Sequence, residues 1–170
     1  VSFELNSKIV KLRNIRFNFG EIHLTPTAKY NSLDSSQLLW NSFKELTVLN
    51  KDGEALFFDR NFKKEEYPER VLTILGVSYS QKQKRVMGKI SLLLNEAPEQ
   101  LDTAQYEIEQ VEIPDGKRWV ATSGFVIDMS GDIPVVVYEF NHRGPRPLDF
   151  EYYIRQMCRH FKMGRGCRFV

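Results

Sequence analysis

The residues best suited to chemistry are basic, and they concentrate near the C-terminal end of the chain. Seven Lys and Arg residues but only two acidic residues lie between His142 and Val170, so this segment carries a charge of +5. The whole chain carries only +2, which leaves −3 for the remainder. Charge of one sign gathered on one segment is typical of proteins that bind phosphate-rich partners.

A basic turn and the helix predicted after it supply the candidate site. The turn HRGPRP, at 142–147, precedes the helix, and a helix N-terminus attracts anions through its free N–H groups. The basic residues of the helix recur every three or four positions and therefore share one face, which suits contact with a phosphate backbone. An ordinary solvated helix face is the alternative, because Pro145 and Pro147 remove N–H donors and Asp149 can occupy the helix dipole. The candidate nucleic-acid-binding residues are Arg143, Arg146, Tyr152, Arg155, Arg159 and Lys162.

Two nuclease hypotheses are weaker alternatives. A metal-dependent nuclease needs carboxylates that converge on one metal, and a metal-free ribonuclease needs a general base such as His142 next to a phosphate clamp such as Arg143. The Walker, dinucleotide-binding and HExxH patterns are absent. We therefore predict no catalytic residue, cofactor or metal site. The carboxylates considered are Glu107, Glu109, Asp115 and Asp128, with Lys117 nearby.

Hydropathy patterns predict an α+β fold with a mostly antiparallel sheet of about six to eight strands and two main helices. The first helix covers 33–50, where Asp34 or Ser35 can cap it. The segment 95–104 is predicted to be a loop or a short helical turn. The predicted strands are 8–19, with a phase change at Arg13–Asn14 and an end at Gly20, then 21–26, 54–58, 70–80, 85–94, 105–114, 118–129 and 133–140.

The second main helix, predicted over 147–163, has the clearest pattern in the chain. Phe150, Ile154, Met157 and Phe161 step by four, three and four residues and form an apolar stripe. This amphipathic C-terminal helix should pack on the sheet through the stripe and turn its basic face to solvent. Gly164 is expected to end the helix in the left-handed conformation.

The layout of residues 118–163 resembles a segment of RexA-like phage-exclusion and abortive-infection proteins. The segment GFVIDMSGDIPVVVYEFNHRGPRPLDFEYYIRQM has a hairpin that ends in a YE strand, then a glycine-bearing break, then an amphipathic helix. The resemblance implies DNA binding or sensing in bacterial or phage defence, in a dimer. It includes no catalytic motif, and the first 117 residues add nothing to it.

Length and composition favour one domain over residues 1–170, with residues 142–170 as its basic C-terminal region. The chain does not begin with Met, so it can be a fragment of a longer protein. No apolar run reaches the ~20 residues of a membrane span, and two cysteines are too few for a disulfide framework, so we expect a cytoplasmic protein with free thiols. Nucleic acid is the expected partner. The alternative is a module that binds an acidic protein surface or forms a homo-oligomer.

Overall fold

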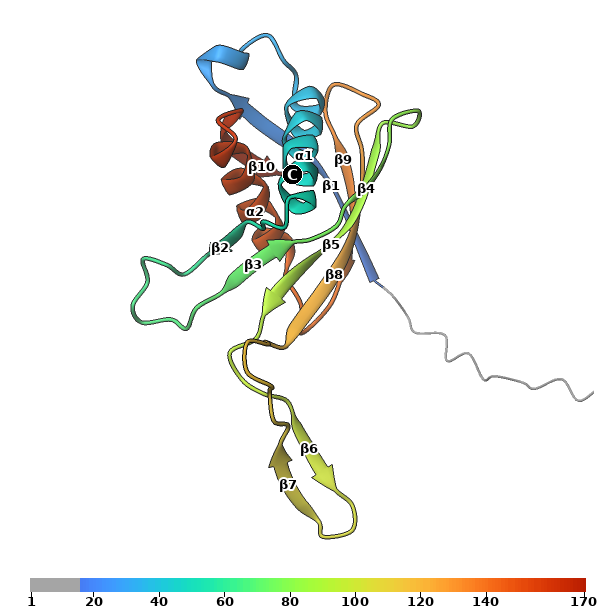
Figure 1. Ribbon diagram of the computed structural model, residues 1–170. Coiled ribbons are helices and arrows are strands. Elements are labelled where there is room, and N and C mark those ends of the chain that lie inside the picture. The colour runs from blue at the N-terminus through green and yellow to red at the C-terminus, as the bar shows by residue number, and fades with distance from the viewer. Residues whose placement is uncertain (1–15) are drawn as a thin grey trace, which may run out of the picture.

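The computed structural model describes residues 16–170, which form a curled antiparallel sheet with two helices on one face (Figure 1). The strand order is β10-β1-β9-β8-β5-β3-β2, and β4 also pairs with β5. This architecture confirms the predicted α+β fold. The strands of the sheet are β1 (Arg16–Pro26), β2 (Phe57–Asp59), β3 (Val71–Ile74), β4 (Ser78–Ser80), β5 (Arg85–Leu93), β8 (Val120–Asp128), β9 (Val135–Phe140) and β10 (Gly164–Phe169), and the helices are α1 (Ser35–Lys51), α2 (Pro147–His160) and the 3-10 turn η1 (Ala28–Tyr30).

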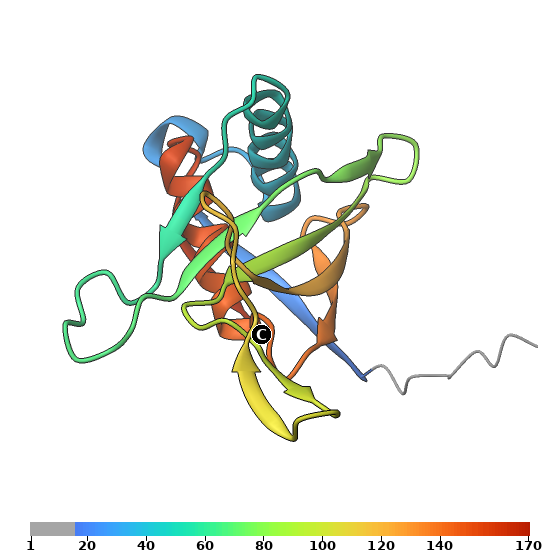
Figure 2. The same cartoon turned by 60° about the horizontal axis from the view of Figure 1, so that its bottom comes forward.

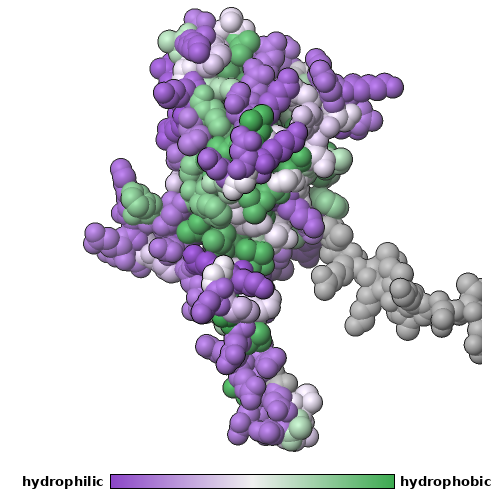
Figure 3. Space-filling model, in the orientation of Figure 1, coloured by the Kyte–Doolittle hydropathy of each residue, from purple (hydrophilic) through white to green (hydrophobic). Residues whose placement is uncertain are grey.

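The core lies between the two helices and the inner face of the sheet. Strand side chains alternate between the two faces, so every second residue of β1, β9, β8 and β5 points toward the helices. The predicted stripe of α2 faces this core: Phe150, Ile154 and Met157 are fully buried, and Phe161, one residue past the helix, is partly buried. In Figure 3 the hydrophobic residues gather over the body of the domain. The two segments that project from it, the loop 60–69 and the arm formed by residues 95–118, are mostly hydrophilic.

Helix α1 begins where its capping residues predict. The Asp34 carboxylate accepts a hydrogen bond from Gln37 N (2.8 Å), and the Gln37 side chain accepts one from Asp34 N (3.1 Å), which completes a capping box. The Ser35 hydroxyl accepts a bond from Leu24 N of β1 (2.9 Å). The helix start is therefore fixed both by its own residues and by the neighbouring strand.

Strand β1 is one continuous strand, and the prediction that Gly20 ends it was wrong. The strand pairs with β9 over Arg16–Glu21 and with β10 over Ile22–Pro26, so it continues because it changes partner. A Cβ on Gly20 would lie 2.4 Å from a ring carbon of Phe169, so this glycine serves a close approach and not a turn. The earlier part of the predicted strand, with the phase change at Arg13–Asn14, lies outside the described residues.

A two-stranded arm projects from the body, where a loop or short helical turn was predicted at 95–104 and a strand at 105–114 (Figures 1 and 2). Strand β6 (Glu99–Asp102) pairs with β7 (Glu107–Gln110), and Tyr106 at the turn has a positive φ of 57°. Every residue of β7 is exposed. The prediction of a loop or short helical turn at 95–104 failed because the sequence of β6, EQLD, has a single apolar residue and therefore no apolar–polar alternation to indicate a strand.

Helix α2 ends three residues earlier than predicted, and Lys162 takes the left-handed role assigned to Gly164. Lys162 has a φ of 59°. Met163 N donates to Cys158 O (2.9 Å) and Lys162 N donates to Arg159 O (3.0 Å), which is the Schellman pattern of a helix end. Gly164 instead begins β10. None of the helices described here is long and apolar enough to cross a membrane.

We predict that Lys162→Gly stabilises the fold, because glycine adopts positive φ without the steric penalty of a side chain. The expected gain is about 0.5–1 kcal/mol in the free energy of unfolding, measured by urea denaturation. Lys162→Ala is the matched control, since it removes the same charge and keeps the strained Cβ. A gain in the alanine variant as large as that in the glycine variant would contradict the assignment.

Candidate nucleic-acid interface

The basic turn before α2 is held in place by its own backbone and by the sheet. The Asn141 side chain donates to Thr122 O of β8 (2.8 Å), and its oxygen accepts from Arg143 N (3.1 Å). A Cβ on Gly144 would lie 2.9 Å from the Ser123 hydroxyl, so only glycine fits this close approach. The contacts of the turn with β8 therefore explain its asparagine and its glycine without any role in binding.

The carbonyl of Pro145 anchors the same turn to two central strands. It accepts hydrogen bonds from the hydroxyls of Tyr138 (2.6 Å) and Ser123 (3.1 Å). Burial raises the pKa of Tyr138 well above its usual value, so this phenol stays protonated and remains a donor. The arginines on either side are thus presented from a rigid support.

A carboxylate of the chain itself already fills the helix N-terminus. Asp149, fully buried, accepts from Arg146 N through Oδ2 (2.8 Å). Arg70 donates two hydrogen bonds to the same carboxylate, from Nε to Oδ1 (2.9 Å) and from Nη2 to Oδ2 (2.6 Å). Arg60 donates a third, from Nη1 to Oδ1 (2.7 Å). Asp149 therefore takes the Arg146 N–H group at this helix N-terminus, which is the alternative to a phosphate cradle that the sequence left open.

These donors set the ionisation of Asp149. Burial by itself would raise the pKa of this carboxyl, but the bonds from Arg70, the Arg146 backbone and Arg60 outweigh burial and hold the pKa below its usual value. The group stays charged at neutral pH. Because two arginines share one carboxylate, the cluster keeps a net charge of +1 beside the turn.

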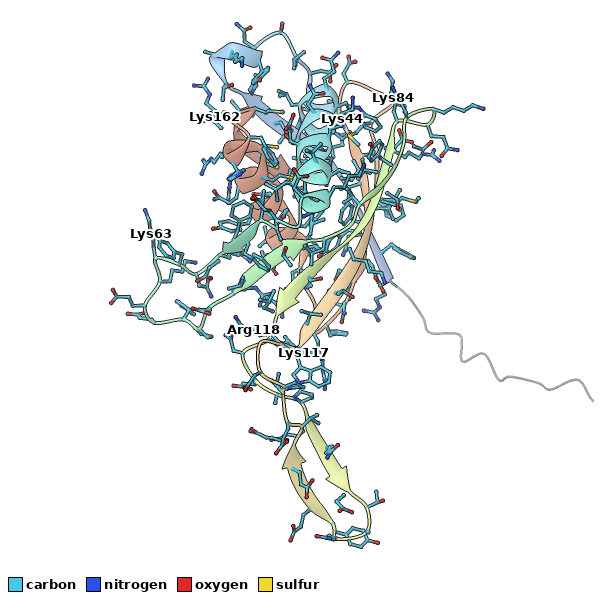
Figure 4. The ribbon with its side chains drawn as sticks, in the orientation of Figure 1. Lys44, Lys63, Lys84, Lys117, Arg118 and Lys162 are labelled. Atoms are coloured by element: carbon cyan, nitrogen blue, oxygen red, sulfur yellow. The ribbon has the colours of Figure 1, made fainter. Side chains whose placement is uncertain are left out.

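The candidate residues divide into two groups at opposite ends of α2. Arg143 and Arg146 are exposed before its first turn, and Arg159 and Lys162 are exposed at its end, about 20 Å away for a helix that rises 1.5 Å per residue. Lys162 projects from the helix end on the same side of the view as Lys63 (Figure 4). The cations thus form an extended row and not a compact pocket.

The two residues in the middle of the row are partly engaged. The Arg155 guanidinium lies 5.7 Å from the centre of the Tyr152 ring, and its Nη1 is 3.6 Å from a carboxylate oxygen of Glu151. The Tyr152 hydroxyl donates to Asp59 O (2.9 Å). Tyr152 is half-buried with one ring face covered by arginine, so it is a poor platform for base stacking.

Sequence reasoning missed the cations that come from other elements. Both Nε and Nη2 of Arg159 donate to the carbonyl of Arg165 in β10 (3.0 and 2.9 Å), which places Arg165 beside the helix end. The charge of the basic C-terminal region, residues 142–170, indicated Arg165. Nothing in the sequence links Arg60 or Arg70 to Asp149, which lies about 80–90 residues away. The α2 basic surface, as we name it, comprises Arg143, Arg146, Arg155, Arg159, Lys162 and Arg165.

Most of this surface has no acidic partner. Within residues 16–170, Arg155 is the one member of the α2 basic surface that forms an ion pair, with Glu151. The other five cations are exposed at their side chains. Exposed arginines with free N–H groups can bind phosphate oxygens through two parallel N–H bonds, whereas Arg159 already uses Nε and Nη2 on the Arg165 carbonyl.

The carboxylates of the nuclease hypothesis do not converge. Glu107 and Glu109 lie on the projecting arm, whereas Asp128 ends β8 in the body and bonds to Arg85 (2.8 Å). In the described part of the chain no three His, Cys, Asp or Glu residues are grouped to hold a metal. His142 packs edge-on against the Phe140 ring, with centroids 4.8 Å apart.

Both cysteines are free and buried, in agreement with the sequence. Burial raises the pKa of the Cys158 thiol to about 11, so this group is a neutral core residue at physiological pH.

No protein-family model, curated protein or solved structure matches the chain.

We predict that Asp149→Asn destabilises the protein by about 3 kcal/mol at pH 7, because it leaves Arg60 and Arg70 without their counter-charge. The folded-state pKa of Asp149 is lowered, so its contribution is complete above the unfolded pKa near 4 and is lost as the pH falls below it. Urea unfolding at pH 7 and pH 3 measures both effects.

The Asp149→Asn variant should therefore lose less stability than the native protein between pH 7 and pH 3. Arg70→Met should cost more than Arg60→Met, since Arg70 makes two bonds to the carboxylate and Arg60 makes one. Equal acid sensitivity in Asp149→Asn and the native chain would show that this carboxylate does not govern the acid response.

Proposed function

We propose that the protein binds nucleic acid without catalysis, through phosphate contacts along the α2 basic surface. The observation that carries the proposal is the row of exposed cations, five of them without an acidic partner in residues 16–170, over about 20 Å of one helix. A row of this length fits several consecutive backbone phosphates, and arginine is suited to bind each of them.

The rigid support of the row adds to the argument. The turn that carries Arg143 and Arg146 is bonded to β8 and β9, and Arg159 is fixed against the backbone of β10. Cations held in place lose little conformational entropy on binding. Most of the row is unpaired, so binding does not first have to break internal ion pairs.

Contacts of this kind position a protein on nucleic acid but do not specify a base sequence. Tyr152 cannot readily add stacking, because Arg155 covers its ring. We therefore expect affinity that depends steeply on salt, with little dependence on sequence. The RexA-like layout of residues 118–163, which include the turn and all of α2, extends the proposal to DNA binding in bacterial or phage defence.

Fluorescence anisotropy with labelled duplex and single-stranded DNA and RNA tests this function. If about four phosphates are contacted on a duplex, the logarithm of the binding constant should fall against the logarithm of salt with a slope of about −3 to −4. Absence of binding at low salt would refute the proposal.

Arg146→Ala and Arg165→Ala are the most informative variants, since they remove exposed side chains at opposite ends of α2. Each should weaken binding about three- to tenfold and reduce the salt slope by about 0.9. Lys82→Ala, in the turn between β4 and β5 that also carries Lys84 (Figure 4), is the matched control and should leave binding unchanged. An equal loss in the control would show that net charge alone, and not this surface, attracts the nucleic acid.

An acidic protein surface is the second candidate partner for the same cations. Absence of nucleic-acid binding at low salt would leave the acidic protein surface as the remaining candidate.

A further inference from the structure

The outer face of the sheet is open, and an apolar row crosses it. The backbone pairing places Phe19 beside Val137, Val137 beside Val126, and Val126 beside Met87, on four adjacent strands. Phe19 is 71% exposed and Met87 49% exposed. The helices cover only the other face (Figures 1 and 2), so no described element covers this row. A contiguous exposed apolar row marks an interaction surface.

Two mixed rows flank the apolar row. One carries opposite charges at its two ends, Glu21 on β1 and Arg85 on β5. The other has an exposed Phe17 on β1 and Lys89 on β5. In strand order β1, β9, β8, β5, the first flanking row is Glu21, Val135, Asp128, Arg85, and the second is Phe17, Glu139, Gly124, Lys89. In the second row, Gly124 and Glu139 lie beyond the last β8–β9 pair and are joined by the bond from Gly124 N to the Glu139 carboxylate (2.8 Å).

We propose that two copies of this chain pack face to face through these three rows, about a two-fold axis parallel to the strands between β9 and β8. The rotation exchanges β1 with β5 and β9 with β8, and it keeps each row opposite itself. Closed two-fold pairing requires a patch that is complementary to itself, and this patch meets that condition.

The charges select this axis. The axis parallel to the strands places Glu21 of each copy opposite Arg85 of the other copy. Within each copy, Arg85 also donates to the Asp128 carboxylate (2.8 Å), which holds its side chain in position. A two-fold axis across the strands would instead place Arg85 opposite Lys89, which is repulsive. Sheets stacked face to face keep their strands within about 30° of each other, and this arrangement meets that condition.

The shapes also agree. The face is hollowed near Gly124, in a depression of about 530 Å³ whose rim includes Met87 and Lys89. The Glu139 carboxylate lies over Gly124 in this hollow, where it accepts a bond from Gly124 N (2.8 Å), and Phe17 of the same chain also lines it. The axis sets Phe17 of the second copy over Lys89, at the edge of this hollow. An aromatic ring can fill the depression and contact the ammonium group.

The contact is small, so the dimer should be weak. Four strands about 4.8 Å apart and six residues about 3.4 Å apart enclose roughly 400 Å² on each copy. Both copies together bury roughly 800 Å², which is below the ~1,200 Å² of stable complexes and typical of transient ones. We expect a dissociation constant on the order of tens of micromolar.

This inference does not depend on the proposed function. The interface lies on the outer face of the sheet, and the α2 basic surface lies on the helix side. In the dimer the two basic surfaces point away from each other, so each remains free to bind its own segment of nucleic acid.

Sedimentation velocity of the full chain between about 5 and 500 µM tests the inference, because this range brackets the expected constant. The mean mass should rise from 19.9 kDa toward twice that value. Phe19→Glu should weaken the dimer at least tenfold. Phe62→Glu, which makes the same change at a 79% exposed phenylalanine of the 60–69 loop, is the matched control and should dimerise normally.

A charge reversal tests the axis itself. Glu21→Lys alone should weaken dimerisation, because it places a second positive charge opposite Arg85 of the other copy. Glu21→Lys combined with Arg85→Glu should restore dimerisation, because the opposite charges face each other again. These residues are exposed, and circular dichroism confirms that each variant folds. A monomer at every concentration, an unaffected Phe19→Glu variant, or a double variant no better than Glu21→Lys would overturn the proposal. DNA binding by Phe19→Glu should equal that of the native chain, so failure of either proposal is seen separately.

Discussion

The buried carboxylate of Asp149 is the constraint on which the arrangement of this domain depends. A charge without access to water must be compensated where it lies. Two arginines from distant parts of the chain, Arg60 after β2 and Arg70 before β3, do so together with the nearby backbone N–H of Arg146. One group thus fixes the start of α2 against the β2–β3 end of the sheet. It also uses up the anion-binding capacity of that helix end.

The position of the turn 141–146 follows from the way β8 and β9 separate. The two strands pair from Asp128 to Phe125 and then diverge, as β8 continues along β5 and β9 continues along β1. The Glu139 carboxylate accepts from Gly124 N at the point of divergence (2.8 Å), and the turn fills the space beyond it through Asn141 and Pro145. The conformation that presents Arg143 and Arg146 is therefore a consequence of sheet geometry.

The domain offers two surfaces of different chemistry on opposite sides. The helix side has exposed cations in a row, and the outer sheet face has an apolar row between charged ends. Both follow from one architecture, since a curled sheet filled by helices on one face leaves its other face open. The proposed association through the sheet face and the proposed phosphate binding through α2 therefore do not compete for the same surface.

Local pattern was enough to determine the fold class, the amphipathic stripe of α2, the cap at Asp34 and the basic character of the last thirty residues, because each depends on residues close in the sequence. Tertiary structure decided what the local pattern could not express. Gly20 continues a strand because Phe169 packs over it, β6 exists because β7 pairs with it, and the Tyr152 hydroxyl is held by the carbonyl of Asp59, 93 residues away. The turn 142–147 was predicted to attract an external anion through the helix N-terminus, and Asp149 fills that place because Arg60 and Arg70 arrive from elements 80–90 residues away. Contacts of that separation depend on the register of the whole sheet, which no segment of the sequence contains by itself.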